Sequence, residues 1–138
     1  MYDFHNNSKV LASKVGTLSN NTAVVATADT QGFLGLEFFV QSGTFADADM
    51  TFAILVEDSS DNSNWSAVAD NFLLGLEIPA SGSLDYTFDN KTMKIGYAGA
   101  NRYVRLTLTP SANTDASPYA ILGIGVKPRV APYTTQIV

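Results

Sequence analysis

The sequence predicts an all-β protein, an antiparallel β-sandwich or barrel of about eight or nine short strands. Three observations support this fold class. Apolar and polar residues alternate with a period of two in five segments, which is typical of half-buried strands. Clusters of Gly, Pro, Asn, Asp and Ser separate these segments at regular intervals. No segment has the apolar spacing of a helix of normal length, and 138 residues correspond to one domain.

The five strongly alternating segments each place a set of apolar side chains on one face of a strand. Between them lie polar residues that are expected on the opposite face, so each strand is half-buried. The apolar sets are Leu34, Leu36, Phe38 and Val40; Phe52, Ile54 and Val56; Leu84, Tyr86 and Phe88; Val104, Leu106 and Leu108; and Leu122, Ile124 and Val126.

Weaker patterns predict the remaining elements of the sandwich. Further strands are expected at residues 10–15, 23–27 and 65–68, and residues 69–74 favour one helical turn.

The patterning stops near both ends of the chain. We therefore expect a single domain over residues 1–138, with an extended N-terminal arm at 1–9 and an extended C-terminal tail at 132–138.

Charge is distributed unevenly along the chain. The net charge of −5 argues against a nucleic-acid partner. Eleven carboxylates and no basic residue lie between Lys14 and Lys91, whereas six basic residues and one acidic residue follow residue 90. Either strand pairing mixes these charges in space, or the molecule is two-faced and docks its basic side on an acidic partner.

Composition excludes several classes of site. The chain has no cysteine, which excludes disulfides, zinc–thiolate sites and cysteine nucleophiles. No apolar run approaches the ~18 residues of a membrane span, so no membrane partner is expected. The N-terminal stretch MYDFHNNSK lacks the basic and apolar regions of a secretory signal, which predicts synthesis and assembly in a cytoplasm.

No residue pattern points to catalysis or to a bound metal or cofactor. The single histidine, His5, lies in the unpatterned N-terminus. The loop that begins at Asp58 resembles a calcium loop, but Ser63 stands where its sharp turn needs Gly and Ala69 where its bidentate Glu belongs. A polar turn is the better interpretation. The paired carboxylates have the spacing of loop edges, so we do not expect an enzyme.

The stretch KIGYAGANRYVRLTL, residues 94–108, places small residues ahead of an alternating strand. Its glycines lack the spacing of a dinucleotide-binding loop and are expected to let the chain turn or bulge before it enters the sheet. The two arginines fall on opposite faces of this strand. Arg105 is expected to point outward beside Tyr103 and Thr107, and Arg102 is expected to need a carboxylate or carbonyl partner.

KIGYAGANRYVRLTLT, followed by YAILGIGVKPRVAP, resembles a group of small head decoration (cement) proteins of tailed bacteriophages, encoded near the major capsid gene. ILVEDSSDNSNWSAVAD resembles the same group's pattern of a strand with an acidic end, a polar turn and a strand with an aromatic residue. The resemblance covers residues 50–132. It implies a jelly-roll β-sandwich, without catalytic residues or cofactors, on the outer surface of the virion capsid. It also implies a dimer or trimer bound to the major capsid protein.

We therefore expect a capsid decoration protein that stabilises contacts between major capsid protein subunits. The terminal arms and the basic C-terminal third are expected to make these contacts. The candidate interface residues are Tyr2, Phe4, Arg105, Arg129, Tyr133 and Ile137.

Two alternative functions stay open. The first is another virion structural role, in the tail or the head–tail connection. The second is a carbohydrate-binding β-sandwich displayed on the virion, which needs exposed aromatic rings on one sheet face. Phe33, Phe39, Tyr103 and Trp65 are the candidates, although a lone tryptophan is more typical of a core.

Overall fold

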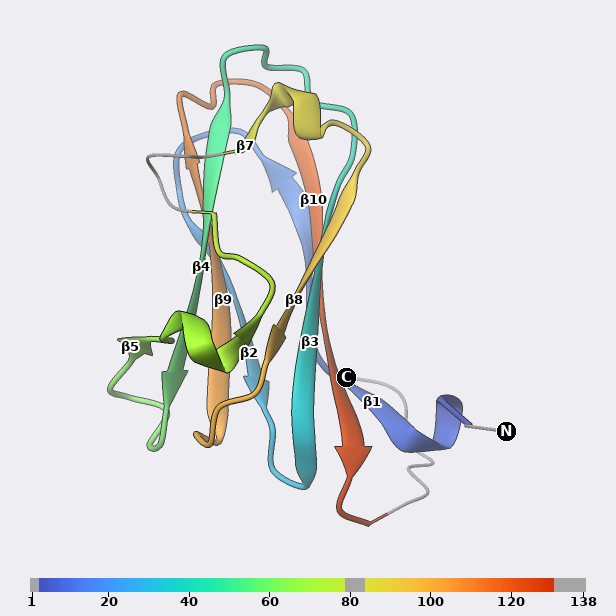
Figure 1. Ribbon diagram of the computed structural model, residues 1–138. Coiled ribbons are helices and arrows are strands. Elements are labelled where there is room, and N and C mark those ends of the chain that lie inside the picture. Colours follow the sequence, from blue (N-terminus) through green and yellow to red (C-terminus); the bar gives the residue numbers. More distant parts are fainter. Residues whose placement is uncertain (1–2, 79–83, 131–138) are drawn as a thin grey trace.

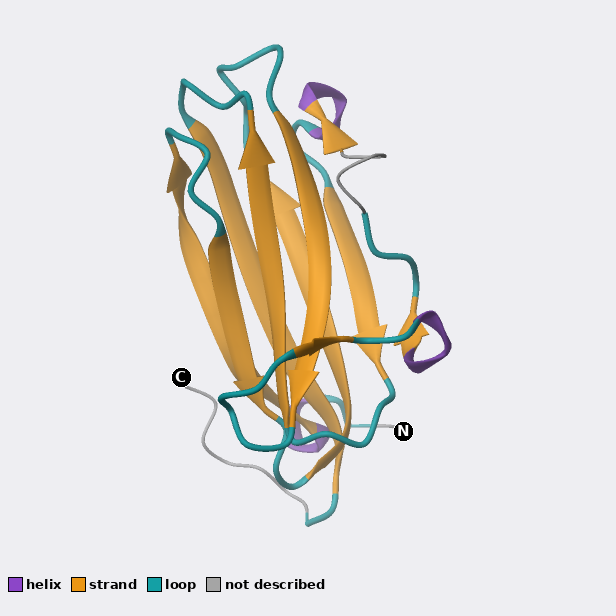
Figure 2. Cartoon of the chain, turned by 90° about the vertical axis from the view of Figure 1, so that its left-hand side faces the viewer, coloured by secondary structure: helices purple, strands orange, loops and turns teal. Residues whose placement is uncertain are grey.

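Two antiparallel sheets face each other in this computed structural model, which describes residues 3–78 and 84–130 (Figures 1 and 2). Sheet A has the strand order β1-β10-β3-β8-β6, and sheet B has the order β2-β9-β4-β5, with β7 also paired to β4. The strands of sheet A are β1 (Ser8–Leu18), β3 (Phe33–Ser42), β6 (Leu73–Leu74), β8 (Thr92–Tyr97) and β10 (Ser117–Pro128). Those of sheet B are β2 (Val24–Asp29), β4 (Thr51–Ser59), β5 (Ser66–Ala67), β7 (Leu84–Asp85) and β9 (Tyr103–Ser111).

The long strands alternate between the two sheets along the chain. β1, β3, β8 and β10 lie in sheet A, and β2, β4 and β9 lie in sheet B. Within sheet A, the first strand, β1, pairs with the last strand, β10, and β10 also pairs with β3. This crossed connectivity is that of a jelly roll. The predicted antiparallel β-sandwich of jelly-roll type is confirmed.

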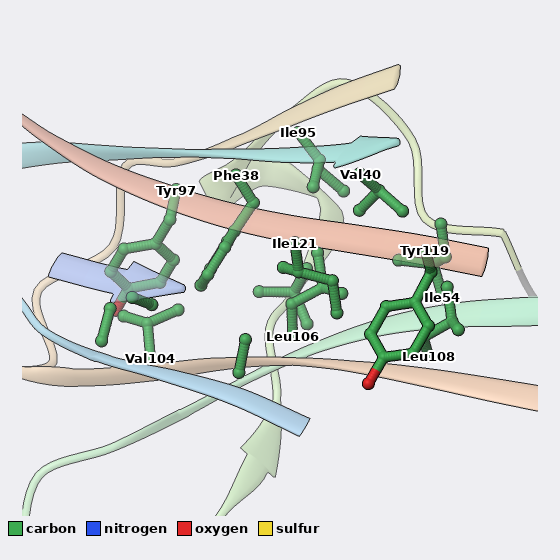
Figure 3. Packing of buried hydrophobic residues seen from close by; sticks show 14 of the residues in the cluster. Phe38, Val40, Ile54, Ile95, Tyr97, Val104, Leu106, Leu108, Tyr119 and Ile121 are labelled. Atoms are coloured by element: carbon green, nitrogen blue, oxygen red, sulfur yellow. The ribbon is translucent and has the colours of Figure 1, made fainter. Parts of the chain in front are cut away.

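The core fills the space between the sheets. Phe38 and Ile95 from sheet A meet Val104 and Leu106 from sheet B, and all four side chains are inaccessible to solvent (Figure 3). Phe38, Val104 and Leu106 belong to the predicted alternating sets, so burial of these apolar sets holds one sheet against the other. Truncating a fully buried ring such as that of Phe38 to alanine costs about 3–5 kcal/mol.

Two predicted elements differ from the structure. Strand β8 was not expected, although Met93, Ile95 and Tyr97 alternate along it. The prediction of a strand over residues 84–88 is correct for Leu84–Asp85, which form β7, and wrong for Tyr86–Phe88. The Asp85 carboxylate accepts hydrogen bonds from the N–H (2.9 Å) and the hydroxyl (2.6 Å) of Thr87, and this cap starts a 3₁₀ turn at Tyr86–Phe88. The turn predicted within 69–74 forms at Asp70–Phe72.

Strand β10 turns a different face to the core than its alternation indicates. Ile121 is buried, whereas Leu122 and Ile124 lie on the outer face of sheet A, half-buried. Gly123 and Gly125 occupy the inner positions. A Cβ there would come within 3.0 Å of the Phe38 ring and 2.5 Å of the Leu11 side chain, respectively, so large side chains of neighbouring strands fill the space instead.

The N-terminal segment expected to be an extended arm at residues 1–9 is partly folded. The Asp3 carboxylate accepts hydrogen bonds from Asn6, and His5–Asn7 forms a 3₁₀ turn. Strand β1 already begins at Ser8. The expected C-terminal tail lies outside the described residues.

Candidate functional site

A groove of about 650 Å³ opens at the end of the sandwich drawn lowest in Figure 1. There the β2–β3 turn, the β8–β9 loop and the end of β10 meet. The volume lies within the roughly 300–1,000 Å³ typical of ligand sites. The lining residues are Thr30, Gln31, Gly32, Phe33, Leu34, Gly35, Tyr97, Gly99, Ala100, Asn101, Arg102, Arg129 and Val130.

The β8–β9 wall of the groove is held by a hydrogen-bonded group that joins the two sheets. The Tyr97 hydroxyl, on β8, donates to Oδ2 of Asp58 on β4 at 2.7 Å and accepts from the Asn101 N–H at 3.0 Å. The Asn101 side chain donates to the other Asp58 oxygen at 2.9 Å. Burial, and then the bond to Asp58, raise the pKa of Tyr97, so its hydroxyl keeps its proton and remains a donor.

Gly99 is required in this loop because the chain passes close to the Tyr97 ring. A Cβ at Gly99 would lie 2.4–2.6 Å from the hydroxyl and ring carbons of Tyr97. Gly96, expected to belong to the same turn, instead lies inside β8, where a Cβ would come within 2.8 Å of a Glu37 carboxylate oxygen. Gly99 thus allows the close approach of the Tyr97 ring, and Gly96 allows that of the Glu37 side chain.

Arg102 has the carboxylate partner that the sequence indicated. Its Nε and Nη2 donate to the two oxygens of Asp29 at 2.8 and 2.7 Å, and both side chains are 44% exposed. These hydrogen bonds from Arg102 lower the pKa of Asp29. The Arg102 carbonyl accepts from the N–H (2.9 Å) and hydroxyl (2.8 Å) of Thr30, which fixes the β2–β3 turn against the loop. That turn has Gly32 at a positive φ of 90°.

Arg129 closes the third side of the groove. Its N–H donates to the Gly32 carbonyl at 2.7 Å, and its side chain is exposed. Leu34 and Val130 beside it are also exposed. The lining contains two arginines and no carboxylate. Because Arg102 is paired with Asp29, Arg129 is the lining cation without an ion-pair partner among the described residues, and it lies beside an apolar margin; this arrangement suits a ligand that carries a carboxylate next to an apolar group.

Arg105 lies outside the groove, on the outer face of sheet B. As predicted, it points outward. Its Nε donates to Oε2 of Glu57 at 2.7 Å, and its guanidinium lies 4.4 Å from the centre of the Trp65 ring. Trp65 was expected in the core and instead lies half-buried against this arginine. The Trp65 ring thus packs against the planar guanidinium of Arg105 at the protein surface, and this contact takes the place of the core contacts that were expected for Trp65.

The other predicted interface residues are scattered or not described. Phe4 is 53% exposed beside the N-terminal turn and is not among the residues that line the groove. Tyr2, Tyr133 and Ile137 lie outside the described residues.

The four aromatic residues named for a sugar-binding face do not share one face. Phe33 is buried at the groove, and Phe39 lies on the outer face of sheet A. Tyr103 and Trp65 both lie at the outer face of sheet B. Tyr103 is contacted by Arg102, whose guanidinium lies 4.9 Å from the ring centre.

The loop after β4 is organised by its own side chains. The Asp61 carboxylate accepts from the N–H groups of Ser63 (2.9 Å) and Asn64 (2.8 Å) and from the Ser59 hydroxyl (2.9 Å). These hydrogen bonds, chiefly those from Asn64, lower the pKa of Asp61. The predicted polar turn is confirmed. Within residues 3–78 and 84–130, no group of three or more His, Asp or Glu side chains is placed to hold a metal ion, and no helix has the length and apolarity to cross a membrane.

No family model matches this sequence, and no curated protein matches it. Its structural neighbours include the PBSX exported protein XepA, with 12% identity, a TM-score of 0.57 and coverage of 100% of this chain and 44% of XepA. A Yersinia pseudotuberculosis-derived mitogen has 13% identity, a TM-score of 0.47 and coverage of 93% and 97%. A xylan-binding domain from Paenibacillus barcinonensis has 11% identity, a TM-score of 0.42 and coverage of 88% of both chains. The chain thus spans less than half of XepA, with which it shares a β-sandwich fold.

Proposed function

We propose that this protein is a virion structural protein, specifically a head decoration protein that binds the outer surface of the capsid through the groove. The observation that carries the proposal is the lining of the groove, in which Arg129 has no ion-pair partner among the described residues and Leu34 and Val130 are exposed. The resemblance of residues 50–132 to decoration proteins supports the phage assignment, and the fold shared with the phage PBSX exported protein agrees with it. No reaction is assigned to the protein.

The opposite end of the sandwich carries several carboxylates in neighbouring loops. Asp47, Asp89 and Asp115 lie in loops that hydrogen bond to one another: the Asp47 carboxylate accepts from the Asp115 N–H at 3.3 Å, and Asp89 accepts from the Phe45 N–H at 2.7 Å. At the groove end, Asp29 and Arg102 neutralise each other, and Arg129 has no ion-pair partner among the described residues. An acidic partner is therefore expected to be repelled by the loops that carry Asp47, Asp89 and Asp115, and to find an unpaired cation at Arg129.

The expected occupant of the groove is an extended acidic segment of the major capsid protein. Arg129 has no ion-pair partner among the described residues, so it is available to a carboxylate of the ligand. The exposed Leu34 and Val130 supply apolar contacts beside it. Binding at many equivalent capsid positions makes a weak individual contact effective.

The test is a binding assay on undecorated heads, with the bound copies counted and head rupture followed on heating. Saturable binding at a fixed ratio to the capsid subunits, with a higher rupture temperature, is expected. Arg129→Gln is expected to weaken binding about tenfold, because one charge-assisted contact is lost. Lys91→Gln, at the opposite end, is the matched control. Raising the salt from about 50 to 300 mM is expected to release the wild-type protein.

Three results would contradict the proposal. They are no binding to heads, binding that neither salt nor Arg129→Gln changes, and equal loss in the Lys91→Gln control. Binding to tails instead of heads would favour the other virion structural role.

A second candidate function is carbohydrate binding at the outer face of sheet B. The observation that favours it is the position of Trp65 and Tyr103 on that face, each contacted by an arginine. Aromatic rings flanked by polar groups bind sugars by stacking and hydrogen bonding. A change in Trp65 fluorescence on titration with glycans, abolished by Tyr103→Ala, is expected if this candidate holds.

A further inference from the structure

Strand β2 forms an open edge of sheet B. It pairs with β9 on one side, from Val24 to Asp29, and no strand of the described residues lies on its other side. Alternate residues of an antiparallel strand turn their N–H and C=O groups to opposite sides, so half of the backbone groups in these six residues face away from β9. Apart from the pairing with β9, no backbone hydrogen bond from the described part of the chain reaches β2. Unpaired backbone groups at an edge bind water or another strand.

The other sheet edges in the described part of the chain carry protective features. On the far side of sheet B, β4 is covered by β5, by β7 and by the bridge from Ile54 to Ile78. In sheet A, β1 has a register shift and carries Lys9 and Lys14, β6 has two residues, and the part of β8 beyond β6 carries Lys94. Covers, short strands, bulges and lysines all keep foreign strands away from a sheet. The edge of β2 has none of them, because its six pairs with β9 run without a shift and residues 24–28 contain no charged residue, glycine or proline.

The outward side chains of β2 define what an added strand must carry. Val25 is 38% exposed and lies in one cross-strand row with Thr107 and Leu55, which is also 38% exposed. Thr27 is exposed in the next row, where Arg105 already has an ion-pair partner. Side chains that lie opposite each other on neighbouring strands contact directly. A strand beside β2 therefore needs an apolar, β-branched side chain next to Val25 and a hydroxyl group two residues along, next to Thr27.

The edge of β2 adjoins the groove. Asp29, the last residue of β2, is followed by Thr30, the first residue of the groove lining, and Figure 1 draws β2 running towards that end of the sandwich. The Thr30 N–H donates to the Arg102 carbonyl at 2.9 Å, which holds the turn in place. An extended chain that leaves the groove past this turn therefore reaches the open edge of β2.

We propose that the extended capsid-protein segment that occupies the groove continues along β2 as an added strand of sheet B. The inference rests on the proposed function, because it takes its occupant from the groove. The added strand supplies partners to the outward N–H and C=O groups of β2, about six in number. Backbone pairing at β2 fixes the register of the segment, and Arg129 binds its carboxylate. A segment held at both places binds more tightly than one held at Arg129 alone.

Amide hydrogen exchange of the full chain, free and bound to undecorated heads, tests the added strand directly. In the free chain, about half of the amides of residues 24–29 are expected to exchange rapidly, because they face away from β9. On heads, these amides are expected to exchange at least tenfold more slowly. The amides of β4, which is covered on both sides within the chain, are the internal reference and are expected to stay unchanged.

Proline substitutions remove one outward N–H group at a time. Adjacent residues of β2 turn their N–H groups to opposite sides, so only one of Val25→Pro and Ala26→Pro removes a hydrogen bond to β9. Thermal melts identify the more stable of the two variants, and this variant is expected to bind heads at least tenfold more weakly than the wild type. Ala69→Pro is the matched control and is expected to bind like the wild type, because Ala69 is exposed beyond β5 and its φ of −70° suits proline.

Other results would overturn the inference. Slower exchange on heads at the groove loop 97–102, without a change at 24–29, would keep the groove as the binding site and exclude the added strand. No binding to heads would contradict the proposed function and the added strand together. Slow exchange of every amide of 24–29 in the free chain would show that the edge is already covered. The cover would be the same chain if this protection were constant from about 10 to 200 µM, and a second copy if it rose with concentration.

Discussion

Replacing Tyr97 by phenylalanine removes one oxygen atom from the wall of the groove and leaves the ring in place. The lost hydroxyl donates to the Asp58 carboxylate at 2.7 Å and accepts from the Asn101 N–H at 3.0 Å. A hydrogen bond to a charged group contributes about 1.5–3 kcal/mol. The Asn101 N–H lies near solvent and can bind water instead, so it adds little. The expected loss of unfolding free energy is therefore about 2 kcal/mol.

Urea denaturation followed by the fluorescence of Trp65, the single tryptophan, measures this loss. The midpoint is expected to fall with an unchanged slope, because the variant exposes the same surface on unfolding. Tyr86→Phe, at an exposed ring, is the matched control and is expected to stay within about 0.3 kcal/mol of the wild type. A coupling of about 1–2 kcal/mol with Asp58→Asn is expected in a double-mutant cycle. The reasoning is refuted if Tyr97→Phe behaves like the control.

Three further predictions follow from the same structure. Gly99→Ala is expected to lower the melting temperature and to weaken binding at the groove, because its Cβ would lie 2.4 Å from the Tyr97 hydroxyl; unchanged melting would contradict the packing argument. Arg105→Gln is expected to cost about 1–2 kcal/mol in urea and to shift the Trp65 emission, and an unshifted spectrum would exclude the stack. Hydrogen bonds from the Asp49 carboxyl, and then from the backbone N–H of Thr114, hold the pKa of Asp47 well below its ordinary value of 3.8. The ionised Asp47 carboxylate therefore stabilises the fold at pH values above 3.8. Asp47→Asn is therefore expected to be less stable than the wild type near neutral pH, with a difference that shrinks as the pH falls below 3.8; a constant difference in urea titrations across this range would contradict the linkage.

Period-two alternation made most of the sandwich predictable, because one buried face per strand leaves a clear trace in the sequence. The inward set of β9, Val104, Leu106 and Leu108, is buried as predicted. Alternation does not predict the structure where a local side-chain hydrogen bond determines the backbone conformation. The carboxylate of Asp85 turns the chain at residues 86–88 although apolar residues still alternate there.

The candidate site was only partly predictable. The strand pattern indicated that Arg102 needs a partner, but the partner, Asp29, lies 73 residues away and is brought close by the pairing of β2 with β9. That pairing is a property of the jelly-roll topology and has no local signal. The role of Gly99 depends on the ring of Tyr97 above it in the same way. The prediction for Trp65 was wrong because residue type alone does not distinguish burial in the core from packing against a half-buried arginine at the surface.

Strand β10 is the long strand for which alternation predicted the wrong face. Its segment YAILGIGV, residues 119–126, has no polar side chain other than the tyrosine hydroxyl, so it is apolar on both faces. Near-continuous apolar runs are typical of strands that are covered on both sides. Sheet B covers the inner side of β10, where Ile121 packs in the core, and no sheet formed by residues 3–78 and 84–130 covers the outer side of Leu122 and Ile124. Leu122 and Ile124 therefore alternate with Gly123 and Gly125, which face the core, and this is why the alternation of apolar side chains predicted the wrong inner face for β10.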